Sequence, residues 1–221
     1  METRNHGAAG DAAWRAVLAT SMLASGIALV VSVLAGLPLW LSLGLLGAMA
    51  VSLVSLRWSQ CDAEGRRLLR AQLRTGVVAG LAATAAYDAS RLLLVHLGRL
   101  PLSPFETFGI FGQLIVGEGG PAWVTHGIGT AYHALNGTAF AIGYCFLLGG
   151  RSWKWGVAWG LGLEAGMLAL YPGWLQLDAV LVEFTTMSFV GHLCYGSVLG
   201  WVSERRLRPH PLLPEADPPG G

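Results

Sequence analysis

The segment from Pro121 to Gly150 most constrains the fold, because it is an apolar run long enough to cross a bilayer. This segment carries two histidines and an asparagine: His126, His133 and Asn136. Hydrocarbon offers no water to solvate an imidazole or an amide, so polar groups at that depth are uncommon and are candidates for a functional site. The segment therefore predicts a membrane helix that carries part of such a site.

The composition agrees with a membrane protein. Of the 221 residues, 53% are hydrophobic and 12% are charged, whereas about a quarter are charged in an average soluble domain. The mean hydropathy is +0.54, and the chain has 31 glycines and nine tryptophans. These values are typical of a polytopic membrane protein. The formal net charge is +1, so the chain lacks the excess of basic residues that is typical of nucleic-acid-binding proteins. We therefore expect the lipid bilayer, and no nucleic acid, as a partner.

The apolar runs predict an all-α protein with six transmembrane helices. The expected spans are residues 16–37, 39–56, 75–97, 122–148, 155–170 and 179–202. Between the third and fourth spans, the run Ser103-Pro104-Phe105-Glu106 resembles a helix N-terminus, with a serine cap and proline at the first helical position. The helix that follows, to about Val116, is too short to span, so we expect it to lie in the interface or to re-enter the membrane.

Basic residues predict the orientation of these spans. If the amino terminus is cytosolic, twelve of the 14 basic residues fall in cytosolic segments. They are Arg4, Arg15, Arg57, Arg66, Arg67, Arg70, Arg74, Arg151, Lys154, Arg205, Arg206 and Arg208. Only Arg99 falls in an outer segment, so the positive-inside rule places both termini in the cytosol. Because arginine is strongly preferred over lysine, a GC-rich bacterial source and the bacterial cytoplasmic membrane are expected.

The same pattern divides the chain into five segments. They are a cytosolic lead at 1–15, an apolar hairpin at 16–56, a basic cytosolic connection at 57–74, a four-helix bundle at 75–202 and a disordered cytosolic tail at 203–221. In the bundle, four glycine pairs have G-x-x-x-G spacing, which favours close helix packing. The pairs are Gly76 with Gly80, Gly156 with Gly160, Gly162 with Gly166, and Gly196 with Gly200.

Eight polar residues within the predicted bundle define a candidate path for a proton or a substrate. At 1.5 Å rise per residue, the central layer contains Asp88, His133, Asn136, Glu164 and His192, and a layer nearer the outer surface contains Arg91, His126 and Glu183. The alternative is purely structural: Asp88 and Arg91 form a pair within one helix, and each histidine makes an interhelical hydrogen bond. Several histidines and carboxylates together favour the functional interpretation.

A metal site is a further hypothesis, built from His133, His192, Glu164 and Asp88. A glutamic acid without a partner in the membrane would be protonated unless a cation meets it. Zinc or iron could therefore occupy such a site, although the sequence requires no cofactor. His126 and His133 are about 10 Å apart along one helix and cannot share a metal.

Three functions from different classes remain open at this stage. The favoured one is transport of a small solute or ion coupled to protonation. The second is a non-catalytic subunit, whose polar residues fix helix packing within a homo-oligomer or a membrane complex. The third is an intramembrane metal-dependent enzyme that acts on a lipid. The absence of an H-E-x-x-H motif from the sequence weakens the enzyme hypothesis.

Overall fold

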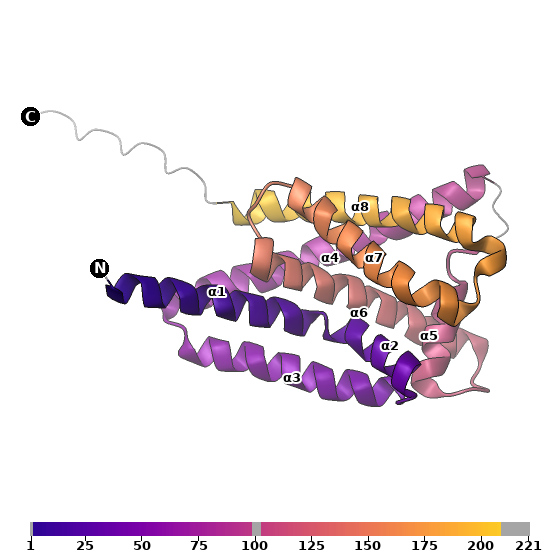
Figure 1. Cartoon of the computed structure of the whole chain (residues 1–221), viewed down its shortest axis with the longest axis horizontal. Coiled ribbons are helices and arrows are strands. Elements are labelled where there is room, and N and C mark those ends of the chain that lie inside the picture. Colours follow the sequence, from indigo (N-terminus) through magenta and orange to yellow (C-terminus); the bar gives the residue numbers. More distant parts are fainter. Residues whose placement is uncertain (1, 99–102, 209–221) are drawn as a thin grey trace, which may run out of the picture.

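The computed structural model describes residues 2–98 and 103–208, and these residues form helices joined by short turns, with no strand. The all-α prediction is confirmed for this part of the chain. The helices are α1 (Glu2–Met22), α2 (Ala24–Ala35), α3 (Leu39–Gln60), α4 (Ala63–Gly98), α5 (Glu106–Val116), α6 (Ala122–Leu148), α7 (Lys154–Leu175) and α8 (Leu181–Leu207), with a 3₁₀ turn at Asp178–Val180 (Figure 1). Of the predicted disordered tail at 203–221, residues 203–207 belong to α8. Arg99 and residues 209–221 lie outside the described residues.

Two or three helical segments are long and apolar enough to cross a membrane by themselves. They are α3 and α4 and, as one broken span, the pair formed by Gly10–Met22 and Ala24–Ala35. The two halves of this pair meet at Leu23 with a bend of 50°. The span expected at 16–37 is therefore a bent pair of helices. By length and composition, the candidate membrane spans therefore lie in the first half of the chain.

Several helices extend beyond the predicted spans. Helix α4 starts at Ala63, so most of the expected cytosolic connection at 57–74 is its first part. Its start is stabilised by Asp62, whose Oδ1 accepts a hydrogen bond from the backbone N–H of Gly65 at 2.8 Å. Helix α7 continues through Pro172 to Leu175. Helix α5 begins at Glu106 without a side-chain cap, two residues later than the Ser103-Pro104 motif indicates.

The helix ends meet in an alternating pattern. The Arg15 side chain of α1 donates from Nε to the carbonyl oxygen of Phe146 near the end of α6, at 2.9 Å. The backbone N–H of Trp153, just before α7, donates to Glu204 Oε2 near the end of α8, at 2.7 Å. The second half of α1 therefore lies beside the end of α6, and the start of α7 lies beside the end of α8. Most of the basic residues that defined the predicted orientation belong to this end of the bundle (Figure 1).

Helix α6 lies at the centre of the arrangement. It packs against α4 and α5 and also contacts α1, while α4 and α7 pack against α8. Glycines allow the closest approaches: a Cβ added to Gly80 on α4 would lie 2.7 Å from the Cα of Thr138 on α6. At the crossing of α7 and α8, Gly156 and Gly196 face each other backbone to backbone. Three of the four predicted glycine pairs therefore act as helix contacts.

The fourth pair behaves differently from the prediction. A Cβ added to Gly162 or Gly166 on α7 would meet no other atom within 4 Å. These two glycines instead line a cavity. The sequence pattern could not separate them from the packed pairs, because the spacing is the same and only the position of the neighbouring helices differs.

Candidate functional site

The first polar pair joins α4 to α6. His133 Nε2 lies 3.1 Å from Asp88 Oδ1 and 3.2 Å from Oδ2. The Arg91 guanidinium lies one helical turn from Asp88, with Nη1 3.8 Å from Oδ1. The pair within one helix that the structural alternative assumed between Asp88 and Arg91 therefore forms only a long contact, because the Asp88 carboxylate faces the imidazole of His133. His133 contributes the hydrogen-bonding partner.

The second polar pair joins α7 to α8. His192 Nδ1 lies 2.6 Å from Glu164 Oε2, and the Ser188 hydroxyl donates to the same oxygen at 2.5 Å. Glu164 is 3% exposed, and its Oε1 has no hydrogen-bond partner among the described residues. Glu164 thus has its partners on the neighbouring helix α8, and the sequence of α7 alone could not predict them. A buried carboxylate is tolerated when hydrogen-bond donors satisfy it in this way.

Tyr87 connects the two pairs. Its ring centroid lies 5.7 Å from that of His133 and 5.0 Å from that of His192. The Arg91 guanidinium carbon lies 4.9 Å from the same ring, within the range of a cation–π contact. Tyr87 is 8% exposed. The two carboxylate–histidine pairs are therefore separated by a single aromatic side chain.

A cavity of about 320 Å³ adjoins both pairs. Both histidines line it, together with Arg91 and Asn136, whereas Asp88 and Glu164 do not. The walls come from α2 and α7, and α4, α6 and α8 contribute the polar side chains. The volume falls in the range of roughly 300–1,000 Å³ typical of small-molecule sites. In this arrangement each carboxylate can orient its histidine, and the histidine can contact a bound molecule.

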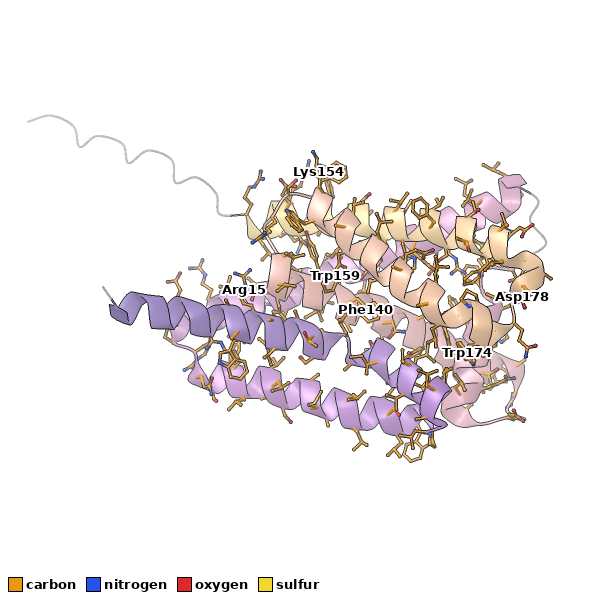
Figure 2. The ribbon with its side chains drawn as sticks, in the orientation of Figure 1. Arg15, Phe140, Lys154, Trp159, Trp174 and Asp178 are labelled. Carbon is orange, nitrogen blue, oxygen red and sulfur yellow. The ribbon has the colours of Figure 1, made fainter. Side chains whose placement is uncertain are left out.

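Aromatic side chains cover the cavity on the side of α5. The Phe108 ring lies 4.7 Å from that of His133, and the Phe111 ring stacks on Trp174 at 6.4 Å. Figure 2 shows Trp174 near the end of α7, on the side of the bundle where α5 lies. Helix α5 is held tightly there, because the Phe108 backbone packs directly against Gly129 of α6.

The base of the cavity is formed where α6 approaches α2. A Cβ added to Gly26 would lie 2.7 Å from Cζ of Phe140, and both residues line the cavity. Figure 2 shows Phe140 in the middle of the bundle, away from both ends. The cavity therefore begins near the centre of the helices and extends towards α5.

The structure brings together most, but not all, of the predicted site residues. Asn136 lines the cavity with a buried Oδ1 that has no partner among the described residues. Arg91, expected nearer the outer surface, lies beside Asp88 at the cavity. His126 is exposed, with Nδ1 3.0 Å from the carbonyl oxygen of Ala122. Glu183 lies in the first turn of α8, half-buried and outside the cavity lining.

The sequence analysis missed Tyr87 and Ser188. Ser188 precedes His192 by four residues, so both lie on one helix face, and this spacing was the available signal. Tyr87 follows no motif; its role comes from the helices that surround it. The four residues proposed as metal ligands are divided between the two pairs, and the described residues contain no group of three or more His, Cys, Asp or Glu side chains arranged to hold a metal.

Fold and site together define an all-helical protein with two to three candidate membrane-spanning helices and a buried polar centre. A family model described as "Family of unknown function (DUF6789)" matches residues 71–212, which is more than half of the chain. The chain belongs to this family. Neither the curated proteins nor the solved structures contain a match. The matched region includes both polar pairs, while α2, which supplies one cavity wall, lies before it.

Proposed function

We propose that the chain is a six-span membrane protein with both termini in the cytosol. Helices α6, α7 and α8 have 27, 22 and 27 residues, and at about 1.5 Å per residue each is long enough for a hydrocarbon layer of about 30 Å. Four of their polar residues, His133, Asn136, Glu164 and His192, face the cavity or one another, and they lower the mean hydropathy of these helices. The alternating helix ends and the shared basic end support the orientation.

Labelling of single cysteines tests this topology. In a variant whose native cysteines are replaced by alanine (Cys61, Cys145 and Cys194), Ser152→Cys and Glu118→Cys place a thiol at opposite ends of α6. We expect a membrane-impermeant maleimide to label position 118 in intact cells, and position 152 only after the membrane is opened. Equal labelling of both positions in intact cells would contradict the proposed orientation.

We further propose that the protein moves a small solute or ion across the membrane in exchange for, or together with, a proton. One observation carries the proposal: two carboxylate–histidine pairs flank Tyr87, and both histidines line a single cavity. Histidine changes its charge near neutral pH, and a buried carboxylate stabilises the charged imidazole. Protonation of either pair therefore changes the charge presented to a bound solute.

The arrangement of the helices suggests how access would alternate. The aromatic residues of α5 cover the cavity on the side predicted to face outward, while α4, α6 and α8 pack closely beyond it. A solute from the outer aqueous phase could enter only if α5 or Phe108 moved. Because Phe108 contacts His133 directly, a change in the charge of His133 would alter the contact that holds this cover in place.

Proton flux into liposomes tests the mechanism. The purified protein is reconstituted with an internal pH-sensitive dye, and a potassium diffusion potential drives proton entry, with and without a panel of small amines, carboxylates and metal cations. We expect flux with wild-type protein, and loss of it in Glu164→Gln and His133→Ala. His96→Ala and Glu118→Gln are matched controls, because both positions are exposed and neither lines the cavity. Absence of flux under every condition, or unchanged flux in the two site variants, would contradict proton coupling.

A further inference from the structure

A buried guanidinium without a close acceptor lies at the cavity. Arg91 is 6% exposed and lines the cavity, and its Nε has no hydrogen-bond partner among the described residues. The carboxylate nearest to it, that of Asp88, lies 3.8 Å away, beyond hydrogen-bonding distance, and is hydrogen-bonded to His133 instead. A buried cation that lacks such partners is strongly destabilising unless another group provides them.

The α2 and α7 walls of the same cavity are largely apolar. On α2 the wall includes Ile27 and Val30, which are 41% and 38% exposed and therefore also reach the outer surface of the bundle. On α7 the wall includes Gly162 and Gly166, where no atom lies within 4 Å of an added Cβ. The two glycines thus leave a strip of open space along α7 at the cavity wall, called the channel below. The cavity combines a cationic end with an apolar side that extends to the surface of the protein.

We propose that the cavity binds a long-chain carboxylate, with its carboxylate on Arg91 and its hydrocarbon tail between α2 and α7. The guanidinium provides two parallel N–H donors, which match the two oxygens of a carboxylate. The exposed edges of Ile27 and Val30 would face lipid in a membrane, so the tail can enter sideways from the bilayer. This route avoids the aromatic cover formed by α5.

This inference deepens the proposed function, because it names the substrate class for the same cavity and rests on the membrane location of the helices. It also connects the substrate to the proton. The bound carboxylate and the carboxylate of Asp88 would lie on the same guanidinium, and a proton on the Asp88–His133 pair offsets the added negative charge. Binding is nevertheless a separate equilibrium from transport and can be measured without any flux.

Competition binding tests the proposal. The wild-type protein in phosphatidylcholine nanodiscs is titrated with dansyl-labelled undecanoate, and energy transfer from the protein tryptophans reports occupancy. Bound probe is then displaced with palmitate, methyl palmitate, acetate or inorganic phosphate. We expect palmitate to displace the probe and methyl palmitate to be weaker by roughly tenfold or more, because the ester cannot form the charged pair with Arg91. Acetate and phosphate, which lack the tail, should not compete.

Two kinds of variant separate the head group from the tail. Arg91→Gln should remove the preference for palmitate over its ester, whereas Arg91→Lys should keep it. Gly162→Leu should fill the channel and weaken both ligands, whereas Gly173→Leu, on the same helix, also faces open space but does not line the cavity, so it should have no effect. The glycine variants retain a test even if Arg91 is required for folding.

Any of the following results would overturn the proposal: equal competition by palmitate and methyl palmitate in the wild type, an unchanged preference in Arg91→Gln, or full binding in Gly162→Leu. Displacement by acetate or phosphate at the concentrations effective for palmitate would also overturn it, because the tail would then play no part. Because these measurements need no proton movement, failure of binding and failure of proton-coupled transport are distinguishable outcomes.

Discussion

Loss of His192 should destabilise the protein because it removes a polar partner of the buried Glu164 carboxyl. Glu164 is 3% exposed, and among the described residues its Oε2 lies 2.6 Å from His192 Nδ1 and accepts a hydrogen bond from the Ser188 hydroxyl at 2.5 Å. Breaking a buried pair from one side costs about 3–5 kcal/mol. Because the His192 side chain is 12% exposed and Ser188 remains, we expect His192→Ala to cost about 3 kcal/mol, at the lower end of that range.

Glu164→Gln should cost less, because glutamine has nearly the same shape and can still accept from Ser188. We expect about 1–2 kcal/mol, the value for a weakened buried hydrogen bond. In the double variant neither member of the pair remains. The space left by the imidazole is the same in His192→Ala and in the double variant, so it does not contribute to the difference. The double variant should therefore cost about 2 kcal/mol less than the sum of the single variants, and this difference is the coupling energy of the pair.

Equilibrium unfolding in mixed micelles of dodecyl maltoside and SDS, followed by tryptophan fluorescence, gives the free energies. A control cycle with His96→Ala and Glu118→Gln, two exposed residues, should show additivity within about 0.5 kcal/mol. A coupling energy for Glu164 and His192 no larger than this control would refute the reasoning, because the two side chains would then not interact favourably in the folded protein.

Two further predictions concern packing and access. Gly196→Leu should destabilise the protein by about 3 kcal/mol or more, because its Cβ would lie 2.9 Å from the Cα of Val157. Gly162→Leu, which faces open space, should change the free energy of unfolding by less than about 0.5 kcal/mol. Similar costs in the two unfolding titrations would contradict the observed crossing of α7 and α8. Phe108→Ala should lower the free energy of unfolding by about 3 kcal/mol, because Phe108 is 6% exposed. It should also raise the rate at which a water-soluble thiol reagent modifies the cysteine of Asn136→Cys. An unchanged rate would show that α5 does not control access to the cavity.

The sequence alone determined the helical class and much of its order. Apolar runs of membrane length favour helices, because a helix satisfies all of its backbone hydrogen bonds within one segment in hydrocarbon. Pro38, Pro121 and the glycines at the turns mark where these helices begin and end. The predicted span at 122–148 agrees with α6 at both ends. The sequence also identified Asp88, His133, Glu164 and His192 as the polar residues of interest, because their placement in apolar helices is costly wherever the helices pack.

Only the tertiary structure decided how these residues are combined. Depth along a helix is fixed by a rise of 1.5 Å per residue, but the direction in which a side chain points depends on the rotation of each helix about its axis and on its neighbours. Asp88 therefore pairs with His133, Glu164 with His192, and Tyr87 lies between them. The same reasoning explains why Gly162 and Gly166 line a cavity while Gly156 and Gly160 form a helix contact: identical spacing has different consequences where a neighbouring helix is present or absent.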